Sequence, residues 1–259
     1  MKTDILEELS ARRRKDAALR ERQEPFAELR ERAQTAPVPP DFAAAFAGPG
    51  LHVIAELKKA SPSEGLIRDD FEPTALAREL AGAGAKALSV LCEPHRFLGS
   101  EAHLRAARDA VSIPVLYKDF VTTPYQVAAA RAAGASAVLL IAAVLDDARL
   151  AELLALCRAL GFAALVETHD ADEIRRAVAA GARIIGVNCR DLRTFKTDPA
   201  IVARLVGTIP SDRVRIAESG LRTADDLRRL VDAGAHGFLV GTALMRAKRP
   251  GEALREMVE

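Results

Sequence analysis

The chain has 259 residues and a nearly neutral charge balance, with 37 Lys and Arg residues against 36 Asp and Glu residues. Hydrophobic residues make up 49% and charged residues 28% of the sequence, a composition typical of a globular protein with a sizeable core. A net charge of +1 gives no support for a general role on nucleic acid or on a membrane surface. A small anionic substrate would need only a local positive pocket.

Cysteine usage and the apolar runs indicate the cellular setting. Cys92, Cys157 and Cys189 suggest neither a disulfide framework nor a CxxC metal pair, so we expect a reducing, cytoplasmic environment. The charged first segment has no apolar signal-peptide core, and the apolar run 135–145 is short for a bilayer. We expect no membrane partner, and we expect a monomer, with a homodimer left open.

Residues 1–50 differ in pattern from the rest of the chain. Helices are predicted near 3–22 and 24–33, followed by a proline-rich link at 37–40. Our main interpretation is a helical extension of a single domain, 1–259, that plugs one end of the fold. The alternative is that the extension also helps to cover a functional mouth.

From residue 50 onward the chain repeats loosely. Ala-Gly-Ala occurs at 83–85, 133–135, 180–182 and 233–235, each time after an amphipathic segment and before an apolar run. Glycine tolerates the left-handed conformation that ends many helices, so the repeating unit is predicted to be helix, glycine, strand. The predicted strands lie near 52–57, 86–91, 113–118, 136–141, 162–167, 183–188, 213–218 and 236–240. The predicted helices lie near 73–82, 101–110, 123–133, 147–159, 170–180, 198–207, 223–232 and 250–258.

Strands that alternate with helices imply parallel pairing and right-handed crossovers. Eight such units in about 210 residues favour a closed (β/α)8 TIM barrel, whose typical length is about 250 residues. The competing fold is a doubly wound open sheet. It usually has fewer strands, and no G-x-G-x-x-G fingerprint follows a strand in this sequence.

Five of the predicted strands end on charged or amide residues, although a strand buried on both faces should be apolar throughout. In a barrel the C-terminal strand ends meet at one mouth, where active sites lie. We therefore predict a site that contains Glu56, Lys58, Lys118, Glu167, Asn188, Arg190, Glu218 and Ser219.

Glu56 and Lys58 are two residues apart, so on a strand they point to the same side, unless they form an exposed ion pair. Burial and nearby cations would lower the pKa of Lys118 and make it a general acid near neutral pH. A Schiff-base lysine and a lysine that reaches solvent remain open alternatives. Glu167 is a candidate acid or base, or a structural partner of a lysine.

The loop after the predicted strand at 183–188 carries Asn188 and Arg190. The asparagine is suited to bind a hydroxyl or an amine, and Arg190 is suited to clamp an anion or to orient Glu218. An ion pair between Arg190 and Asp191 is the alternative.

Glycines in the last two strand-end loops, Ser219-Gly220 and Gly241-Thr242, allow backbone N–H groups to approach an anion. Loops at these two places frequently bind phosphate in barrels, so a phosphorylated substrate is predicted, although a glycine in a loop is usually only a turn residue. The five histidines show no metal-ligand spacing, and His169 is expected at a helix start or on the surface. No metal and no cofactor are predicted.

Taken together, these segments resemble the indole-3-glycerol phosphate synthase family of tryptophan biosynthesis. The matching motifs run in order along the chain: I-A-E-L-K-K-A-S-P-S at 54–63, L-S-V-L at 88–91, F-L-G-S at 97–100, V-L-Y-K-D-F at 115–120, L-V-E-T-H at 165–169, G-V-N-C-R-D-L at 186–192, A-E-S-G-L at 217–221 and F-L-V-G-T-A-L-M at 238–245. Glu64 departs from the family pattern, which commonly has lysine there.

The resemblance implies a (β/α)8 barrel that converts 1-(2-carboxyphenylamino)-1-deoxyribulose 5-phosphate to indole-3-glycerol phosphate, carbon dioxide and water without a cofactor. It implies that Lys118 protonates the ketone and that Glu167 and Lys58 transfer the other protons. Glu56, Asn188, Arg190 and Glu218 would position the substrate. Lys58 and Ser61 would meet its carboxylate, Ser219, Gly220, Gly241 and Thr242 would hold its phosphate, and Phe97, Phe120, Leu139, Leu192 and Leu239 would line an apolar slot for its ring.

Two other functions are weighed against this one. A related phosphate-binding barrel such as phosphoribosylanthranilate isomerase would share the phosphate loops but would not need the four groups Glu56, Lys58, Lys118 and Glu167. A non-catalytic barrel that binds a phosphorylated ligand or a partner chain would be expected to lack at least one acid or base, and the sequence retains them all.

Overall fold

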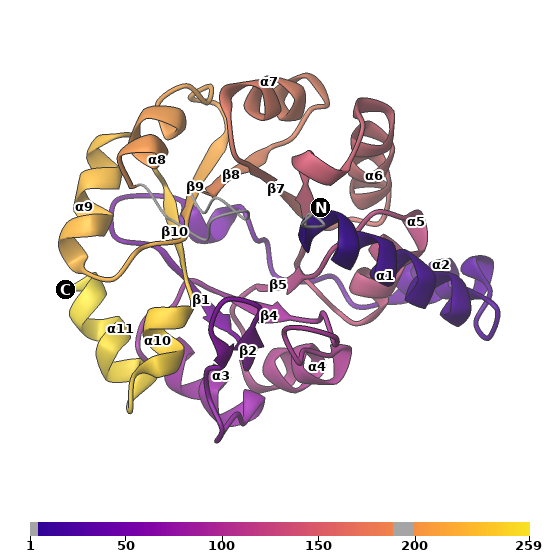
Figure 1. Ribbon diagram of the computed structural model, residues 1–259, viewed down its shortest axis with the longest axis horizontal. Coiled ribbons are helices and arrows are strands. Elements are labelled where there is room, and N and C mark those ends of the chain that lie inside the picture. Colours follow the sequence, from indigo (N-terminus) through magenta and orange to yellow (C-terminus); the bar gives the residue numbers. More distant parts are fainter. Residues whose placement is uncertain (1–4, 189–198) are drawn as a thin grey trace.

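The computed structural model describes residues 5–188 and 199–259. Within them lies a closed barrel of parallel strands in the order β1-β10-β9-β8-β7-β6-β5-β4, ringed by helices (Figure 1). This arrangement confirms the predicted (β/α)8 fold. The barrel strands are β1 (Val53–Leu57), β4 (Ala87–Leu91), β5 (Val115–Lys118), β6 (Ala137–Ile141), β7 (Ala163–Thr168), β8 (Ile184–Asn188), β9 (Val214–Glu218) and β10 (Gly237–Val240). The surrounding helices are α3 (Pro73–Gly82), α4 (Glu101–Ala110), α5 (Pro124–Ala132), α6 (Asp147–Ala159), α7 (Ala171–Ala179), α8 (Pro199–Val206), α9 (Ala224–Asp232) and α11 (Pro250–Val258).

Several short elements were not predicted, because one or two turns leave no periodic pattern in a sequence. They are a two-stranded ribbon of β2 (Ala60–Ser61) and β3 (Gly65–Leu66), the helix α10 (Thr242–Arg246), and the 3₁₀ turns η1 (Ala44–Phe46) and η2 (Ala142–Val144). The ribbon and α10 both lie on the loops that follow strands. The unpredicted elements therefore belong mainly to the mouth of the barrel.

Side chains alternate between two apolar cores along the barrel strands. In β1, Val53, Ala55 and Leu57 join the core beneath the helices, whereas Ile54 joins the barrel interior. Because the side-chain period of a strand is two, the residue two positions later faces the interior again. This period places charged residues at the mouth directly above interior apolar ones: Glu56 above Ile54, Lys118 above Leu116, Glu167 above Leu165 and Glu218 above Ile216.

Local sequence signals define where the helices begin and end. Thr123 and Thr223 form capping boxes at the starts of α5 and α9, and Asp170 accepts a hydrogen bond from the backbone of Glu173 at the start of α7. The central glycines of the four Ala-Gly-Ala repeats all have positive φ angles, from 83° to 103°, as expected for helix stops. Across the described residues, the helices are too short or too polar to cross a bilayer.

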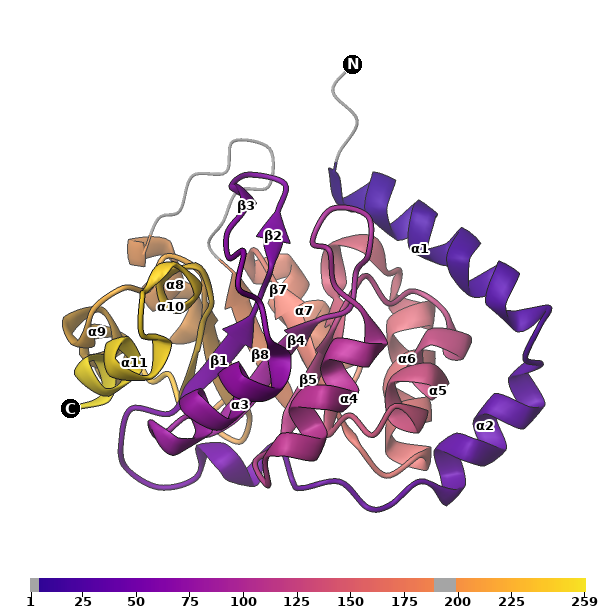
Figure 2. The same ribbon diagram turned by 90° about the horizontal axis from the view of Figure 1, so that it is seen from below.

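The N-terminal extension contacts the barrel at both ends. It contains α1 (Ile5–Glu21) and α2 (Phe26–Thr35), which pack on α5, and a link that crosses beneath the barrel (Figure 2). In this link Phe42 and Phe46 are buried in the interior core, with their ring centroids 5.3 Å apart. Leu9 of α1 joins the same core. The link of the extension therefore closes one end of the barrel with aromatic rings. Its helix α1 extends toward the opposite end.

Candidate active site

Lys118, the last residue of β5, lies between two carboxylates at the mouth. Its Nζ donates to Glu167 Oε2 at 2.9 Å and to Glu218 Oε2 at 3.0 Å. Asn188 Nδ2 donates to the other oxygen of Glu167 at 3.1 Å. The ends of β5, β7, β8 and β9 thus bring four predicted residues into one cluster.

The predicted direction of the Lys118 pKa shift was wrong. Burial lowers this pKa, but the negative charges of Glu167, Glu218 and Glu56 outweigh burial and raise the pKa above its ordinary value. The prediction assumed neighbouring cations, whereas the nearest neighbours are carboxylates. Lys118 is therefore an ammonium group at neutral pH, with a proton available to donate.

The two carboxylates beside Lys118 hold protons with different affinities. Burial favours the neutral form of Glu167, but Lys118 and His169 outweigh it and hold the pKa of Glu167 well below its usual range. At Glu218, burial and the negative charge of Glu167 raise the pKa to about 8 despite the nearby Lys118. Neighbouring groups whose surroundings separate their pKa values are typical of acid–base catalysis.

Glu56 and Lys58 form a second charged pair at the end of β1. Lys58 Nζ donates to Glu56 Oε1 at 2.6 Å, and both residues are buried, so the alternative of an exposed ion pair is wrong. Gly241 packs against this pair, because a Cβ at position 241 would lie 2.4 Å from Glu56 Oε1. The absence of a side chain at Gly241 therefore leaves space for the Glu56 carboxylate.

A cavity of about 380 Å³ opens beside Lys58, between the loops that follow β9 and β10. Ser219 and Gly220 both have left-handed φ angles, +65° and +77°, in the first loop. A non-glycine residue in this conformation is uncommon and often marks a functional loop. The second loop, Gly241-Thr242, leads into α10, and loops at these two places with a short extra helix often hold phosphate in barrels. The predicted phosphate-binding residues thus line one cavity.

Two arginines that the sequence analysis missed also line this cavity. Arg222 lies in the loop after β9, and Arg246 is the last residue of α10. Arg246 forms an ion pair with Glu64, which lies between β2 and β3. Because these charges lie beyond the strand ends, the pattern of strands that stop on charges contains no signal for them.

A smaller, mainly apolar cavity of about 120 Å³ adjoins the Lys118 cluster. The rings of Phe97 and Phe120 line it, with centroids 6.2 Å apart. Both cavities include Glu56, Lys58 and Ser219 in their linings, so they are parts of one continuous mouth. The remaining apolar lining residues are Leu6, Leu91, Leu139, Ile141 and Leu239.

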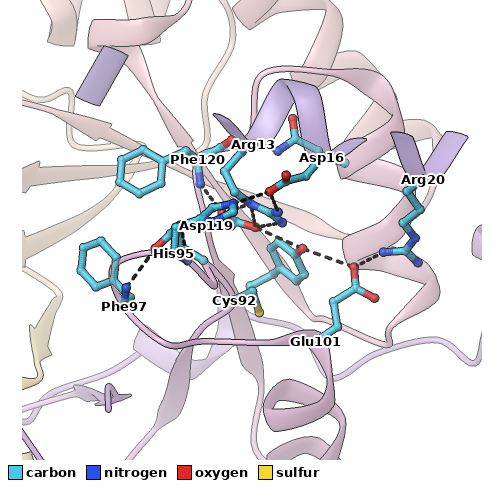
Figure 3. Close-up of polar contacts among 12 residues, drawn as sticks. Arg13, Asp16, Arg20, Cys92, His95, Phe97, Glu101, Asp119 and Phe120 are labelled. Atoms are coloured by element: carbon cyan, nitrogen blue, oxygen red, sulfur yellow. Dashed lines mark hydrogen bonds and ion pairs between the residues drawn. The ribbon is translucent and has the colours of Figure 1, made fainter. Parts of the chain in front are cut away.

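The extension is tied to this mouth by a polar network (Figure 3). Arg13 of α1 grips the buried carboxylate of Asp119, with Nε 3.0 Å from Oδ1 and Nη2 2.7 Å from Oδ2. Asp16 accepts a second bond from Arg13 and lies 2.8 Å from His95 Nε2. Since Asp119 directly follows Lys118, and Leu6 lines the apolar cavity, α1 forms part of the mouth.

His169 lies at a helix start, as expected, one residue before the N-cap Asp170 of α7, and its ring also lies inside the charged cluster. Its Nε2 is 3.4 Å from Glu167 Oε1, and its Nδ1 is 3.1 Å from Glu173 Oε2. Burial lowers the pKa of His169, but the two carboxylates raise it to about 10. The signal in the sequence for this role is the position of His169 two residues past the strand-end Glu167.

One predicted residue lies away from the two cavities, and others fall outside the described residues. Ser61 is buried in β2, where its hydroxyl accepts a hydrogen bond from the backbone of Glu64, and it is absent from the described linings of both cavities. Arg190 lies outside the described residues, as do Leu192 and the alternative partner Asp191.

A larger cavity lies at the opposite barrel end. It has a volume of about 610 Å³ and is lined by the proline-rich link and by the N-terminal ends of β7 and β8. Arg158 and Arg183 at this site are exposed, and the charged cluster contributes no described residue to it. Since the buried titratable groups line the smaller cavities, the mouth is the better candidate for the active site.

The fold and the site define a (β/α)8 barrel that gathers buried titratable groups and two glycine-containing loops at one mouth. The family described as indole-3-glycerol phosphate synthase matches residues 6–257. The chain belongs to the indole-3-glycerol phosphate synthase family.

Curated relatives agree over nearly the full length. The chain is 52% identical to "Indole-3-glycerol phosphate synthase 2" of Streptomyces coelicolor over 232 residues, which cover 90% of each chain. It is 47% identical to the indole-3-glycerol phosphate synthase of Laribacter hongkongensis over 260 residues, covering 98% of this chain and 99% of the relative.

Solved structures support the fold alone. The 3-hexulose-6-phosphate synthase of Salmonella typhimurium superposes with a TM-score of 0.65 at 14% identity, over 80% of this chain and 96% of that one. A structure titled "Native KDPGal structure" matches with a TM-score of 0.58 at 22% identity, over 82% of this chain and 94% of that one.

Proposed function

We propose that this mouth closes the indole ring of indole-3-glycerol phosphate in tryptophan biosynthesis. The substrate is 1-(2-carboxyphenylamino)-1-deoxyribulose 5-phosphate, and the products are indole-3-glycerol phosphate, carbon dioxide and water. The observation that carries the proposal is the protonated Lys118 between Glu167 and Glu218, beside both an apolar and a phosphate-sized cavity. Family membership supports the same reaction.

In the first step the ring carbon that bears the carboxylate bonds to the ketone carbon. Lys118 donates a proton to the ketone oxygen, which becomes a hydroxyl group. The carboxylate then leaves as CO2, and its bonding electrons restore the aromatic ring. Because its pKa is raised, Lys118 enters this step as an ammonium group with a proton to donate.

In the second step the new hydroxyl leaves as water and the indole double bond forms. Lys58 donates the proton to the leaving hydroxyl, and Glu167 removes a proton from the adjacent carbon. Glu56 orients Lys58 through their 2.6 Å hydrogen bond. Asn188 holds Glu167 in place, and Glu218 holds Lys118. Arg190 is proposed to contact the substrate.

The phosphate is assigned to the loops Ser219-Gly220 and Gly241-Thr242, with Arg222 and Arg246 at the rim. Phe97 and Phe120 would contact the aromatic ring of the substrate. Ser61 is absent from the described linings of both cavities, so its proposed contact with the substrate carboxylate requires the β2–β3 ribbon to move. Because the described residues of one barrel supply the assigned proton-transfer and phosphate groups, we infer a monomer, whose mass sedimentation would measure. We also infer a cytoplasmic setting, which the free thiols of Cys92 and Cys157 support.

Turnover of the carboxyphenylamino substrate by the pure chain tests the proposal. We expect indole fluorescence and CO2 to appear in equal amounts. A substrate analogue without the carboxylate should give neither product. Folded protein that releases no CO2 from the full substrate would contradict the proposal, and conversion of a phosphoribosyl anthranilate substrate would favour the isomerase alternative.

A further inference from the structure

The loop between the end of β4 and the start of α4 carries Phe97, one of the two aromatic rings that line the apolar cavity. Three consecutive backbone N–H groups of this loop, those of His95, Arg96 and Phe97, donate to the carboxylate of Glu93 at 2.7, 2.7 and 2.9 Å. The N–H of Gly99 donates to the backbone carbonyl of Glu93 at 2.8 Å. Glu93 therefore organises a segment that belongs to neither a helix nor a strand.

The loop is folded tightly around this carboxylate. Glu93 is fully buried, whereas residues 94–96 and Leu98 are exposed, so the backbone surrounds the carboxylate as a nest surrounds a bound anion. Leu98 has a φ of 52°, in the left-handed region that is uncommon for residues other than glycine. At Gly99 a Cβ would lie 2.3 Å from a carbonyl oxygen at the end of β4. The backbone path is thus fixed on both sides of the residue that carries the ring.

The second ring of the cavity is held by the same kind of contact. Asp119 is buried, and its Oδ1 accepts a hydrogen bond from the backbone N–H of Phe120 at 2.8 Å. The rings of Phe97 and Phe120 lie together at the edge of the polar network, with centroids 6.2 Å apart (Figure 3). Resting on the proposed function, we propose that Glu93 is a positioning residue that sets the place of Phe97 against the aromatic ring of the substrate.

The contacts between this loop and α1 are weaker restraints than Glu93. His95 Nε2 lies 2.8 Å from Asp16 Oδ2, but the two side chains are 34% and 33% exposed. Arg96 lies 3.6 Å from Glu8, and its side chain is 48% exposed. Exposed ion pairs stabilise little, whereas hydrogen bonds to a buried carboxylate are about twice as strong as those between neutral groups. The position of Phe97 therefore depends mainly on Glu93.

A double-mutant cycle between Glu93→Gln and Phe97→Leu tests the proposal. Glutamine keeps the shape of the side chain, but its NH2 group cannot accept, so at least one N–H of the loop would face another donor. We expect KM to rise about tenfold in each single variant and kcat to stay within about twofold of wild type, because the ring contact is made equally to substrate and transition state. The double variant should have the KM of a single variant, since both changes remove one contact.

Asp41→Ala is the control for loss of a carboxylate that binds backbone. Asp41 Oδ1 accepts from the backbone N–H groups of Ala43 and Ala44, but it lies at the opposite barrel end. Both Glu93→Gln and Asp41→Ala should lower the melting temperature, whereas only Glu93→Gln should raise KM. Glu93→Asp keeps the charge on a shorter side chain, so its KM should lie between those of wild type and Glu93→Gln. It replaces Glu93→Gln in the cycle if that variant does not fold.

An unchanged KM in Glu93→Gln, or effects on KM that add in the double variant, would overturn the proposal. A readout without substrate is ¹⁹F NMR of protein labelled with 4-fluorophenylalanine, in which Phe97→Leu identifies the resonance of Phe97. That resonance should shift in Glu93→Gln and stay in place in Asp41→Ala, and an unshifted resonance in Glu93→Gln would also overturn the proposal. If the resonance shifts but wild type shows no turnover, the proposed function fails and the positioning of Phe97 by Glu93 stands.

Discussion

The mouth has two halves, a reaction half around Lys118 and a phosphate half around Gly220 and Gly241. The two halves differ in the groups that carry or bind charge. Around Lys118, buried side chains with shifted pKa values face one another at hydrogen-bond distance. Around Gly220 and Gly241, backbone turns, hydroxyl groups and arginines at the rim line the cavity, with the Glu56–Lys58 pair at its border with the other half. The difference follows from what each half must do, since a moving proton requires titratable groups, whereas a phosphate requires only fixed donors.

Lys118→Ala gives the largest expected effect and tests the reaction half. We expect kcat to fall about a thousandfold, because the proton donor for the ketone is lost. Two buried carboxylates also lose their cation, so thermal stability should decrease while the fold persists. The exposed Lys86→Ala, at the opposite end of the barrel, is the control and should retain wild-type turnover. Substantial activity in Lys118→Ala would refute the assignment of the general acid.

Gly186→Ala tests whether the reaction half depends on precise placement. A Cβ at position 186 would lie 2.1 Å from Glu218 Oε1 and 3.2 Å from its Cδ, so the carboxylate must move. A displacement of about 1 Å in such a site costs about a hundredfold in kcat. Gly82→Ala, where a Cβ meets no atom within 4 Å, is the matched control. Equal kcat in the two variants would show that Glu218 tolerates displacement.

The same contrast explains how much could be predicted from sequence. Charged residues at the ends of apolar strands identified Glu56, Lys118, Glu167 and Glu218 as site residues. A buried strand should be apolar throughout, so a charge at its end stands out from the pattern. The barrel followed from the repeat of helix, glycine and strand.

What was missed depends on contacts between distant segments. The direction of the Lys118 pKa shift required knowing that Glu167, from a strand beyond the adjacent one, lies 2.9 Å away. Leu6 lines the mouth because α1 is held against the barrel by distant contacts, such as that of Arg13 with Asp119, 106 residues apart in sequence. Arg246 lies on a short helix without a periodic pattern.

Arg246→Ala tests the phosphate half separately. Loss of one charged donor at the rim should raise KM about tenfold, equivalent to about 1.4 kcal/mol, and leave kcat nearly unchanged. Arg249→Ala removes an exposed arginine three residues away that is paired with Glu252 and lies outside the cavity lining, so its KM should stay at the wild-type value. A fall in kcat without a change in KM would mean that the two halves are not separate in function.

The pH dependence of stability offers a smaller effect that belongs to the reaction half. The folded-state pKa of Glu218 is raised to about 8, so its ionisation increasingly disfavours the folded state as pH rises from about 4.5 to 8. His169, raised to about 10, stabilises fully below pH 6.5 and loses that contribution as pH rises toward 10. The melting temperature should therefore fall between pH 6.5 and 8, and Glu218→Gln should reduce the slope. A melting temperature that rises over this range would contradict the charge assignment.

The smallest expected effect concerns the link between Glu64 and Arg246. Glu64 holds Arg246 at the rim of the phosphate cavity, but Arg246 is 60% exposed, and exposed ion pairs contribute at most about 1 kcal/mol. If Glu64 competes with the phosphate for this arginine, Glu64→Ala should lower KM about twofold. Glu252→Ala, which frees Arg249 outside the cavity, should leave KM unchanged. A rise in KM of Glu64→Ala would mean that the pair holds the β2–β3 ribbon in a productive position. In that case the phosphate half, like the half around Lys118, would depend on a charge pair as well as on backbone donors.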